Sequence, residues 1–186
     1  MFRYLLFLLI AADTFCAGWK TFEWGMSKDQ VLQEIKSQGL RCNDSGSIGE
    51  VPVCHTAVGS YKATVKFILH EKFGLKHVEL FIIPEPAKGK KLSKGMRVNF
   101  TRTLYRAYLH KYGIHVARTK DETPTHLWHF VENRKTAVAF IELTPAVKVK
   151  YSGHEILAKI RKDKKLEEER KKAELKANAM KVINDI

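Results

Sequence analysis

The chain has 186 residues, a formal net charge of +13 and three cysteines, and 28% of its residues are charged. This length predicts one domain with short appendages, since domains commonly have roughly 100 to 200 residues. The excess of Lys and Arg favours polyanionic partners such as acidic lipid headgroups or surface polysaccharide. The export signal described next makes nucleic acid the least favoured partner.

Residues 1–18 are predicted to be a signal peptide. Arg3 precedes an apolar run over residues 4–12, which is too short to span a membrane because a spanning helix needs about 20 residues. Cleavage after Gly18 leaves small residues at the recognition positions, so the mature chain is expected to begin near Trp19. The alternative is an uncleaved N-terminal anchor. The sequence therefore predicts an exported protein, periplasmic or secreted, without a transmembrane span in its mature form.

The cysteines favour one disulfide. The residues before Cys16 do not resemble a lipobox, which argues against a lipid anchor at that position. Removal of the signal peptide leaves Cys42 and Cys54 as an even pair in an exporting context. A bond between them would contribute on the order of 2 to 3 kcal/mol by restricting the unfolded chain. The alternative is two buried free thiols.

The first helix is predicted over residues 28–38. Ser27 and Gln30 have the S-x-x-Q spacing of a capping box, in which each side chain accepts a backbone N–H of the other residue. Gly39 and Leu40 have the spacing of a Schellman ending, because glycine accepts a left-handed conformation after a helix.

The remaining elements follow from periodicity. Alternation of apolar and polar residues predicts strands, and a stripe with an apolar residue every four positions predicts a second helix that ends at Gly113. A loop is expected over residues 118–125, because Pro124 lies in it. The predicted strands are residues 61–71, 75–83, 126–132, 136–143 and 147–151, and the predicted second helix is residues 94–112.

These elements predict an α+β fold. Two helix-plus-β-hairpin units would form one antiparallel sheet packed by two helices, in a domain that covers residues 19–152. Residues 153–186 are predicted to form a long charged helical tail, partly solvated, and the absence of a sustained apolar seam argues against a coiled coil. The alternative to a plain charged tail is contact with a protein partner or an anionic envelope surface.

No catalytic, metal-binding or cofactor-binding set is expected. His126 and His129 are three residues apart on a predicted strand, so they would point to opposite faces and could not chelate one ion together. The sequence has no G-x-S-x-G nucleophile motif and no P-loop. The absence of such motifs favours a non-enzymatic protein that needs no cofactor.

A candidate basic surface lies around the second helix. Lysines crowd the loop before the helix, and arginines lie beside its apolar stripe. The ordinary interpretation of such a run is a solvated connector, and the alternative is a binding patch. The residues of this candidate surface are Lys88, Lys90, Lys91, Lys94, Arg97, Arg102 and Arg106.

The segment Trp24-Gly25-Met26-Ser27 resembles the helix start of small exported bacterial proteins of poorly characterised function. With the helix and strands that follow, it is more loosely similar to the envelope module of the small outer-membrane assembly lipoprotein. The resemblance implies an exported binding or envelope-accessory protein, and it assigns no functional residue. The alternatives are a secreted effector that acts on host partners and a hydrolase with an unrecognised site.

Overall fold

The computed structural model describes residues 18–43, 51–86, 91–113, 116–120, 123–130, 135–143 and 145–184. Side chains are described for residues 19–43, 51–86, 91–113, 135–143 and 145–180. The predicted signal peptide lies almost entirely outside these ranges, so cleavage and export stay predictions. The predicted α+β class and the long C-terminal helix are confirmed.

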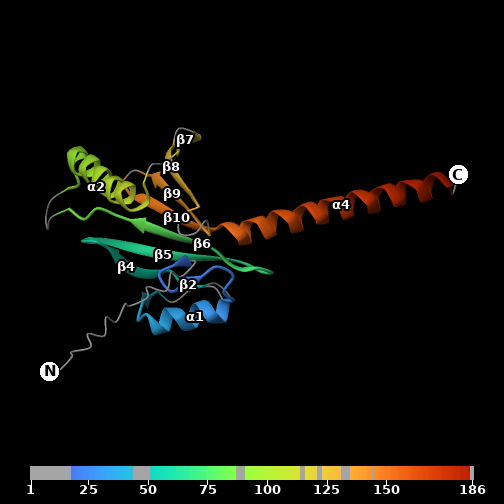
Figure 1. The fold of residues 1–186 in the computed structure, drawn as a ribbon, viewed down its shortest axis with the longest axis horizontal. Coiled ribbons are helices and arrows are strands. Elements are labelled where there is room, and N and C mark those ends of the chain that lie inside the picture. Colours follow the sequence, from blue (N-terminus) through green and yellow to red (C-terminus); the bar gives the residue numbers. More distant parts are fainter. Residues whose placement is uncertain are drawn as a thin grey trace, which may run out of the picture.

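Ten strands and three helices make up the described fold (Figure 1). The N-terminal elements are β1 (Gly18–Trp19), β2 (Phe22–Glu23), α1 (Lys28–Ser37), β3 (Arg41–Cys42), β4 (Cys54–Val58), β5 (Tyr61–His70) and β6 (Gly74–Ile82). The C-terminal elements are α2 (Lys94–Tyr112), β7 (Val116–Lys120), β8 (Thr123–Phe130), β9 (Thr136–Glu142), β10 (Val147–Gly153) and α4 (His154–Asn184).

The main sheet joins two similar halves. Its eight strands have the order β3-β4-β5-β6-β10-β9-β8-β7, and every pairing is antiparallel. Each half is therefore one helix followed by four strands, and the halves meet through their last strands. Leu80 of β6 lies opposite Val149 of β10 at the middle of this seam. The predicted repeat is present in this larger form, with four-stranded units in place of hairpins.

The predicted loop over residues 118–125 is wrong where the structure describes it, because β7 and the start of β8 occupy those positions. Pro124 lies inside β8 opposite Thr119 of β7. Pairing of β8 with β9 begins only at Thr125. Proline is tolerated at such a margin of a sheet, because no partner strand on the other side needs its missing N–H.

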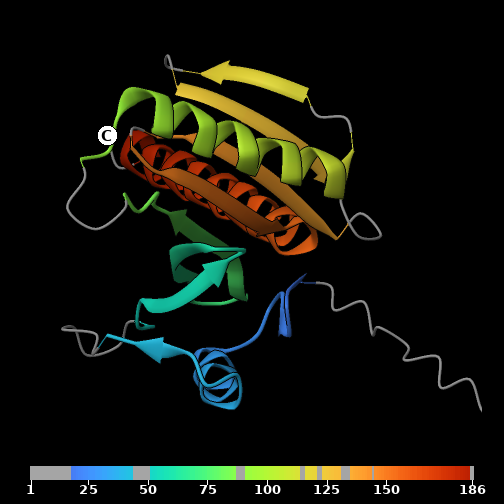
Figure 2. The same cartoon turned by 90° about the vertical axis from the view of Figure 1, so that its left-hand side faces the viewer.

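One face of the sheet forms the core with both helices. Near the N-terminus, the Phe22 ring lies 4.5 Å from the Phe67 ring of β5, and Val31 of α1 is fully buried with them. On the other half, the hydroxyls of Tyr108 on α2 and Tyr151 on β10 are 3.0 Å apart. Figure 2 shows α2 lying along the strands of the second half, while α1 lies at the other end of the molecule beside β3.

The predicted ends of the first helix are confirmed. Ser27 Oγ accepts the N–H of Gln30, and the Gln30 side chain accepts the N–H of Ser27. At the other end, the N–H groups of Gly39 and Leu40 donate to the carbonyls of Lys36 and Ile35, which is the Schellman arrangement. Local side-chain chemistry therefore sets where α1 begins and ends, while burial of Val31 and Ile35 holds the helix on the core.

The predicted disulfide is also confirmed. Cys42 and Cys54 lie opposite each other on β3 and β4, and their sulfur atoms are 1.99 Å apart. The bond links β3, which has only two residues, to β4, where Cys54 is fully buried.

Helix α4 follows β10 without a connecting loop and leaves the domain (Figure 1). Only its first turn is anchored by a buried side chain, that of Ile156. At 1.5 Å per residue its 31 residues extend about 46 Å. Ion pairs four residues apart, such as Lys164–Glu168 and Glu167–Lys171, stabilise the exposed part. None of the described helices is long and apolar enough to cross a membrane.

Candidate functional site: a basic groove beside α2

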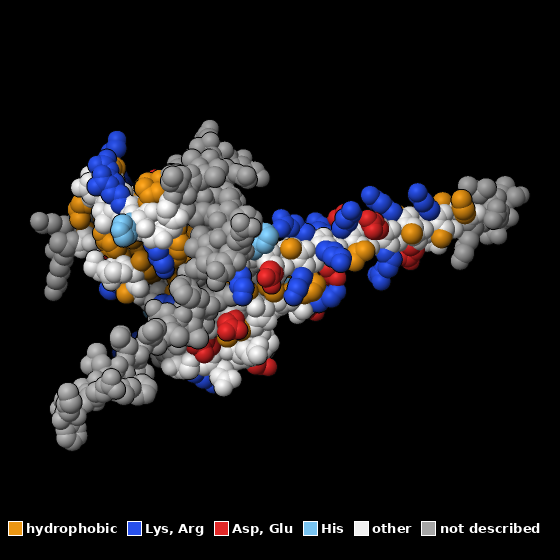
Figure 3. Space-filling model, in the orientation of Figure 1, with side chains coloured by type: hydrophobic (Ala, Val, Ile, Leu, Met, Phe, Trp, Pro, Cys, Tyr) orange, Lys and Arg blue, Asp and Glu red, His pale blue; other side chains and the backbone are white. Residues whose placement is uncertain are grey.

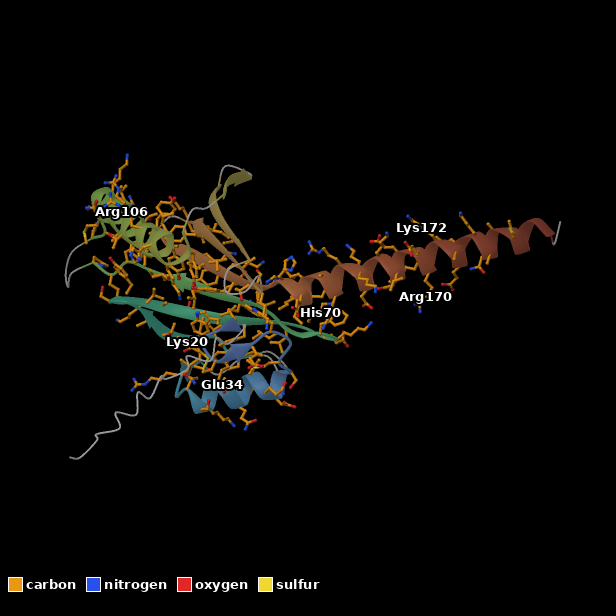
Figure 4. All side chains as sticks on the ribbon, in the orientation of Figure 1. Lys20, Glu34, His70, Arg106, Arg170 and Lys172 are labelled. Carbon is orange, nitrogen blue, oxygen red and sulfur yellow. A yellow bond between two sulfur atoms is a disulfide. The ribbon has the colours of Figure 1, made fainter. Side chains whose placement is uncertain are left out.

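The structure brings three residues of the predicted basic surface together. Lys94, Arg97 and Arg102 line a groove of about 540 Å³ between α2 and the turn that joins β9 to β10. Lys91 precedes the helix and is exposed, and Arg106 is exposed on α2 and extends outward from it (Figure 4). The predicted residues Lys88 and Lys90 lie outside the described residues.

The remaining lining of the groove is largely apolar. Val98 of α2 is 47% exposed, and Leu143 of the β9–β10 turn is 38% exposed. Pro145 and the Tyr105 ring complete this surface. The Tyr105 ring lies 5.9 Å from the Phe140 ring, so the groove rests directly on the core. The sequence could not place Leu143 and Pro145 beside α2, because these residues belong to a distant strand turn.

The groove is electropositive. Helix α2 carries five Lys and Arg side chains and no Asp or Glu. Within the described part of the chain, Lys94, Arg97 and Arg102 form no ion pair, and Glu142 is the one carboxylate that lines the groove. Lys94 and Arg97 occupy the first turn of α2, where the helix dipole disfavours a cation by about 0.3 to 1 kcal/mol. Helix stability therefore does not explain the placement of these charges.

A second polar cluster crosses the seam on the opposite face of the sheet. The Glu79 carboxylate on β6 is 9% exposed, and it lies 3.6 Å from the Lys148 ammonium and 3.9 Å from the Lys150 ammonium of β10. Glu79 is opposite Lys150 in the strand register. A one-residue slip would move Glu79 to the apolar face, so the cluster helps to specify how the halves pair.

His77 and Ser152 form the one pair in the described residues that resembles a base and its nucleophile. His77 Nδ1 lies 3.0 Å from Ser152 Oγ, across the seam between β6 and β10. Burial, with the positive charges of Lys150 and Lys76, lowers the pKa of His77 to about 4. An effective general base has a pKa near the working pH, so this imidazole is a weak proton acceptor at neutral pH.

The segment that begins with Trp24 is a structural joint at the base of α4. The Trp24 indole N–H donates to Thr136 Oγ1 on β9 at 2.9 Å, and its ring covers Gly153 at the end of β10. The Gly25 N–H donates to the carbonyl of Leu75 at 2.9 Å, so the same segment is also bonded to β6. A cleft of about 960 Å³ runs from this joint along the β5–β6 hairpin.

The described residues contain no group of three His, Cys, Asp or Glu side chains that could hold a metal ion. His126 and His129 lie in β8, but their side chains are outside the described residues, so that part of the metal argument stays a prediction.

Comparison with known proteins gives no assignment. No family model, no curated protein and no solved structure matches this chain.

Proposed function

We propose that this chain is a non-enzymatic binding protein of the cell envelope, which engages an anionic partner through the groove beside α2. The observation that carries this proposal is the convergence of Lys94, Arg97 and Arg102 around exposed apolar side chains, with no ion-pair partner among the described residues. The envelope location rests on the predicted signal peptide and on the resemblance of the Trp24 segment to small exported proteins. The disulfide supports this location, because disulfides persist in oxidising compartments.

The test is the binding of a soluble anionic polymer. Dextran sulfate is titrated into the protein and into the triple variant Lys94→Gln, Arg97→Gln, Arg102→Gln, followed by calorimetry. The matched control removes three positive charges from exposed positions of α4, with the changes Lys162→Gln, Lys172→Gln and Lys176→Gln. The groove variant is expected to lose most of the affinity and the control to keep it. Equal losses would show that only net charge matters.

A second candidate site is the exposed part of α4. Leu166, Leu175 and Met180 are large apolar side chains exposed to solvent along this helix. Truncation after Lys164 would keep the buried anchor Ile156 and remove these side chains. Equal recovery of partners by the full-length and truncated proteins would exclude binding through the tail.

The hydrolase alternative has one specific site to test, the His77–Ser152 pair. Its low histidine pKa argues against nucleophile activation at neutral pH. Ester hydrolysis by the purified protein that is abolished by Ser152→Ala would establish the alternative and refute the non-enzymatic proposal.

A further inference from the structure

The groove and α4 lie at opposite ends of β10. The groove borders the turn before Val147, and α4 begins directly after Gly153. Seven residues of strand separate the two ends, or about 23 Å at 3.3 Å per residue. Figure 1 shows α2 at one end of the molecule and α4 leaving the other. A partner held at the groove would therefore be separated from the free end of α4 by the length of the domain and the helix.

The two ends also differ in charge. Helix α2 has only basic charged residues, whereas α4 mixes Lys and Arg with Asp and Glu as far as Glu174. Figure 3 shows blue and orange side chains together over α2, and blue and red side chains along α4. An extended anionic surface would attract the α2 end more strongly than α4.

We infer that the groove end docks onto an anionic lipid bilayer, with Val98 and Leu143 entering the headgroup boundary and the surrounding cations contacting lipid phosphates. This inference rests on the proposed function and names the partner of the same groove. Interfacial binding proteins combine exposed apolar side chains with Lys and Arg in this way, because each type of contact alone binds weakly.

Two observations favour a bilayer over other anionic partners. A soluble polysaccharide offers no apolar layer, so the exposure of Val98 and Leu143 would bring no gain in affinity. A protein partner would bury the centre of the patch, and Lys, unlike Arg, is depleted from protein interfaces, so Lys94 is the groove cation that favours lipid over protein. Lys94 and the arginines around the apolar side chains are instead well placed for phosphate groups.

The docked orientation would place α4 away from the membrane. Because β10 leads from the groove to α4, the helix would extend into the aqueous phase and display Leu166 and Leu175 at a distance from the lipid. The protein would thus act as a spacer between a bilayer and whatever contacts its tail.

The experiment measures co-sedimentation of the purified protein with vesicles of phosphatidylglycerol mixed with phosphatidylcholine, and with vesicles of phosphatidylcholine alone. Binding is expected only to the anionic vesicles. Removal of one interfacial cation should weaken binding about fivefold, so the groove triple variant should bind about a hundredfold more weakly. The α4 triple variant serves as the charge-matched control and should bind like the unmodified protein. Binding to neutral vesicles alone, or an equal loss in both variants, would overturn the inference.

The apolar contribution is tested with the double variant Val98→Asn, Leu143→Asn, which leaves all charges in place. Val98 is 47% exposed and Leu143 38%, so the variant should unfold at a somewhat lower urea concentration than the unmodified protein, and urea unfolding checks that it is still folded under the binding conditions. Its binding to anionic vesicles should be roughly tenfold weaker at physiological ionic strength, where charge attraction is screened. Unchanged binding would show that no side chain enters the bilayer.

The orientation is tested by trypsin digestion of the vesicle-bound protein. Cleavage at Arg97 and Arg102 should be suppressed by the bilayer, while cleavage in α4 should continue. Protection of α4 would overturn the orientation.

The dextran sulfate titration distinguishes failure of the lipid inference from failure of the proposed function. If the groove binds the polymer and anionic vesicles do not bind, the lipid inference fails and the proposed function stands. If neither binds, both fail.

Discussion

The contact between Trp24 and Gly153 gives the sharpest prediction about the fold. A Cβ atom at position 153 would lie 2.7 Å from Cγ and 2.8 Å from Cδ2 of the Trp24 ring. Carbon atoms in contact are normally 3.5 to 4.0 Å apart, so Gly153→Ala would force the ring to move by roughly 1 Å. The ring is held on its other side by the 2.9 Å hydrogen bond to Thr136, whose side chain is 1% exposed.

The magnitude follows from three contributions. Overpacking of a well-packed site costs about 1 to 3 kcal/mol, and loss of the indole hydrogen bond costs about 1 kcal/mol more. Alanine in a strand gains about 0.5 to 1 kcal/mol over glycine, because the unfolded chain has less freedom to lose. Gly153→Ala should therefore lower the free energy of unfolding by about 1 to 3 kcal/mol.

The sign should reverse when the ring is absent. Trp24→Ala alone should cost about 3 kcal/mol, and adding Gly153→Ala to it should raise stability by about 0.5 kcal/mol. The four proteins of this double-mutant cycle are compared by urea unfolding followed by circular dichroism, which gives the coupling free energy directly. Equal costs of Gly153→Ala with and without the Trp24 ring would refute the contact and the role of this segment as the joint at the base of α4.

Three further measurements test other parts of the fold. Ser27→Ala should lower the free energy of unfolding by about 1 kcal/mol through loss of the α1 cap, and a loss of dextran sulfate binding at unchanged stability would contradict a purely structural role. Replacing both Cys42 and Cys54 with serine should lower the urea midpoint by the equivalent of about 3 kcal/mol, and reduction of the unmodified protein should do the same. Because the pKa of His77 is lowered from 6.5 to about 4, the unfolded chain binds more protons between these values, and stability should fall as the pH falls through this window. Because His77 is partly exposed, solvent screening reduces the loss of unfolding free energy to about 1 to 2 kcal/mol. His77→Gln should remove this part of the pH dependence, as measured by urea unfolding at pH 7 and pH 4. An unchanged pH dependence in the variant would show that His77 is not buried as described.

The candidate site was predictable only in part. The basic run of α2 is visible in the sequence, because its charges lie on one helix with a regular period. The apolar lining from Leu143 and Pro145 was not predictable, since these residues meet α2 only after β9 and β10 have paired. The His77–Ser152 pair was missed for the same reason, because its members come from the last strands of different halves.

The sequence by itself determined the elements whose causes are local. Ser27 and Gln30 cap α1, Gly39 ends it, and alternation marks β5, β6, β9 and β10, because each depends on neighbours within a few residues. Only the tertiary structure decided what depends on distant partners. The β6–β10 seam joins the halves, and short strands such as β3 form only against a neighbour. Trp24 donates a hydrogen bond to Thr136, which lies 112 positions further along the chain. Through that bond, the segment that begins α1 also supports the base of α4. Packing energy depends on which surfaces are in contact and not on their order along the chain.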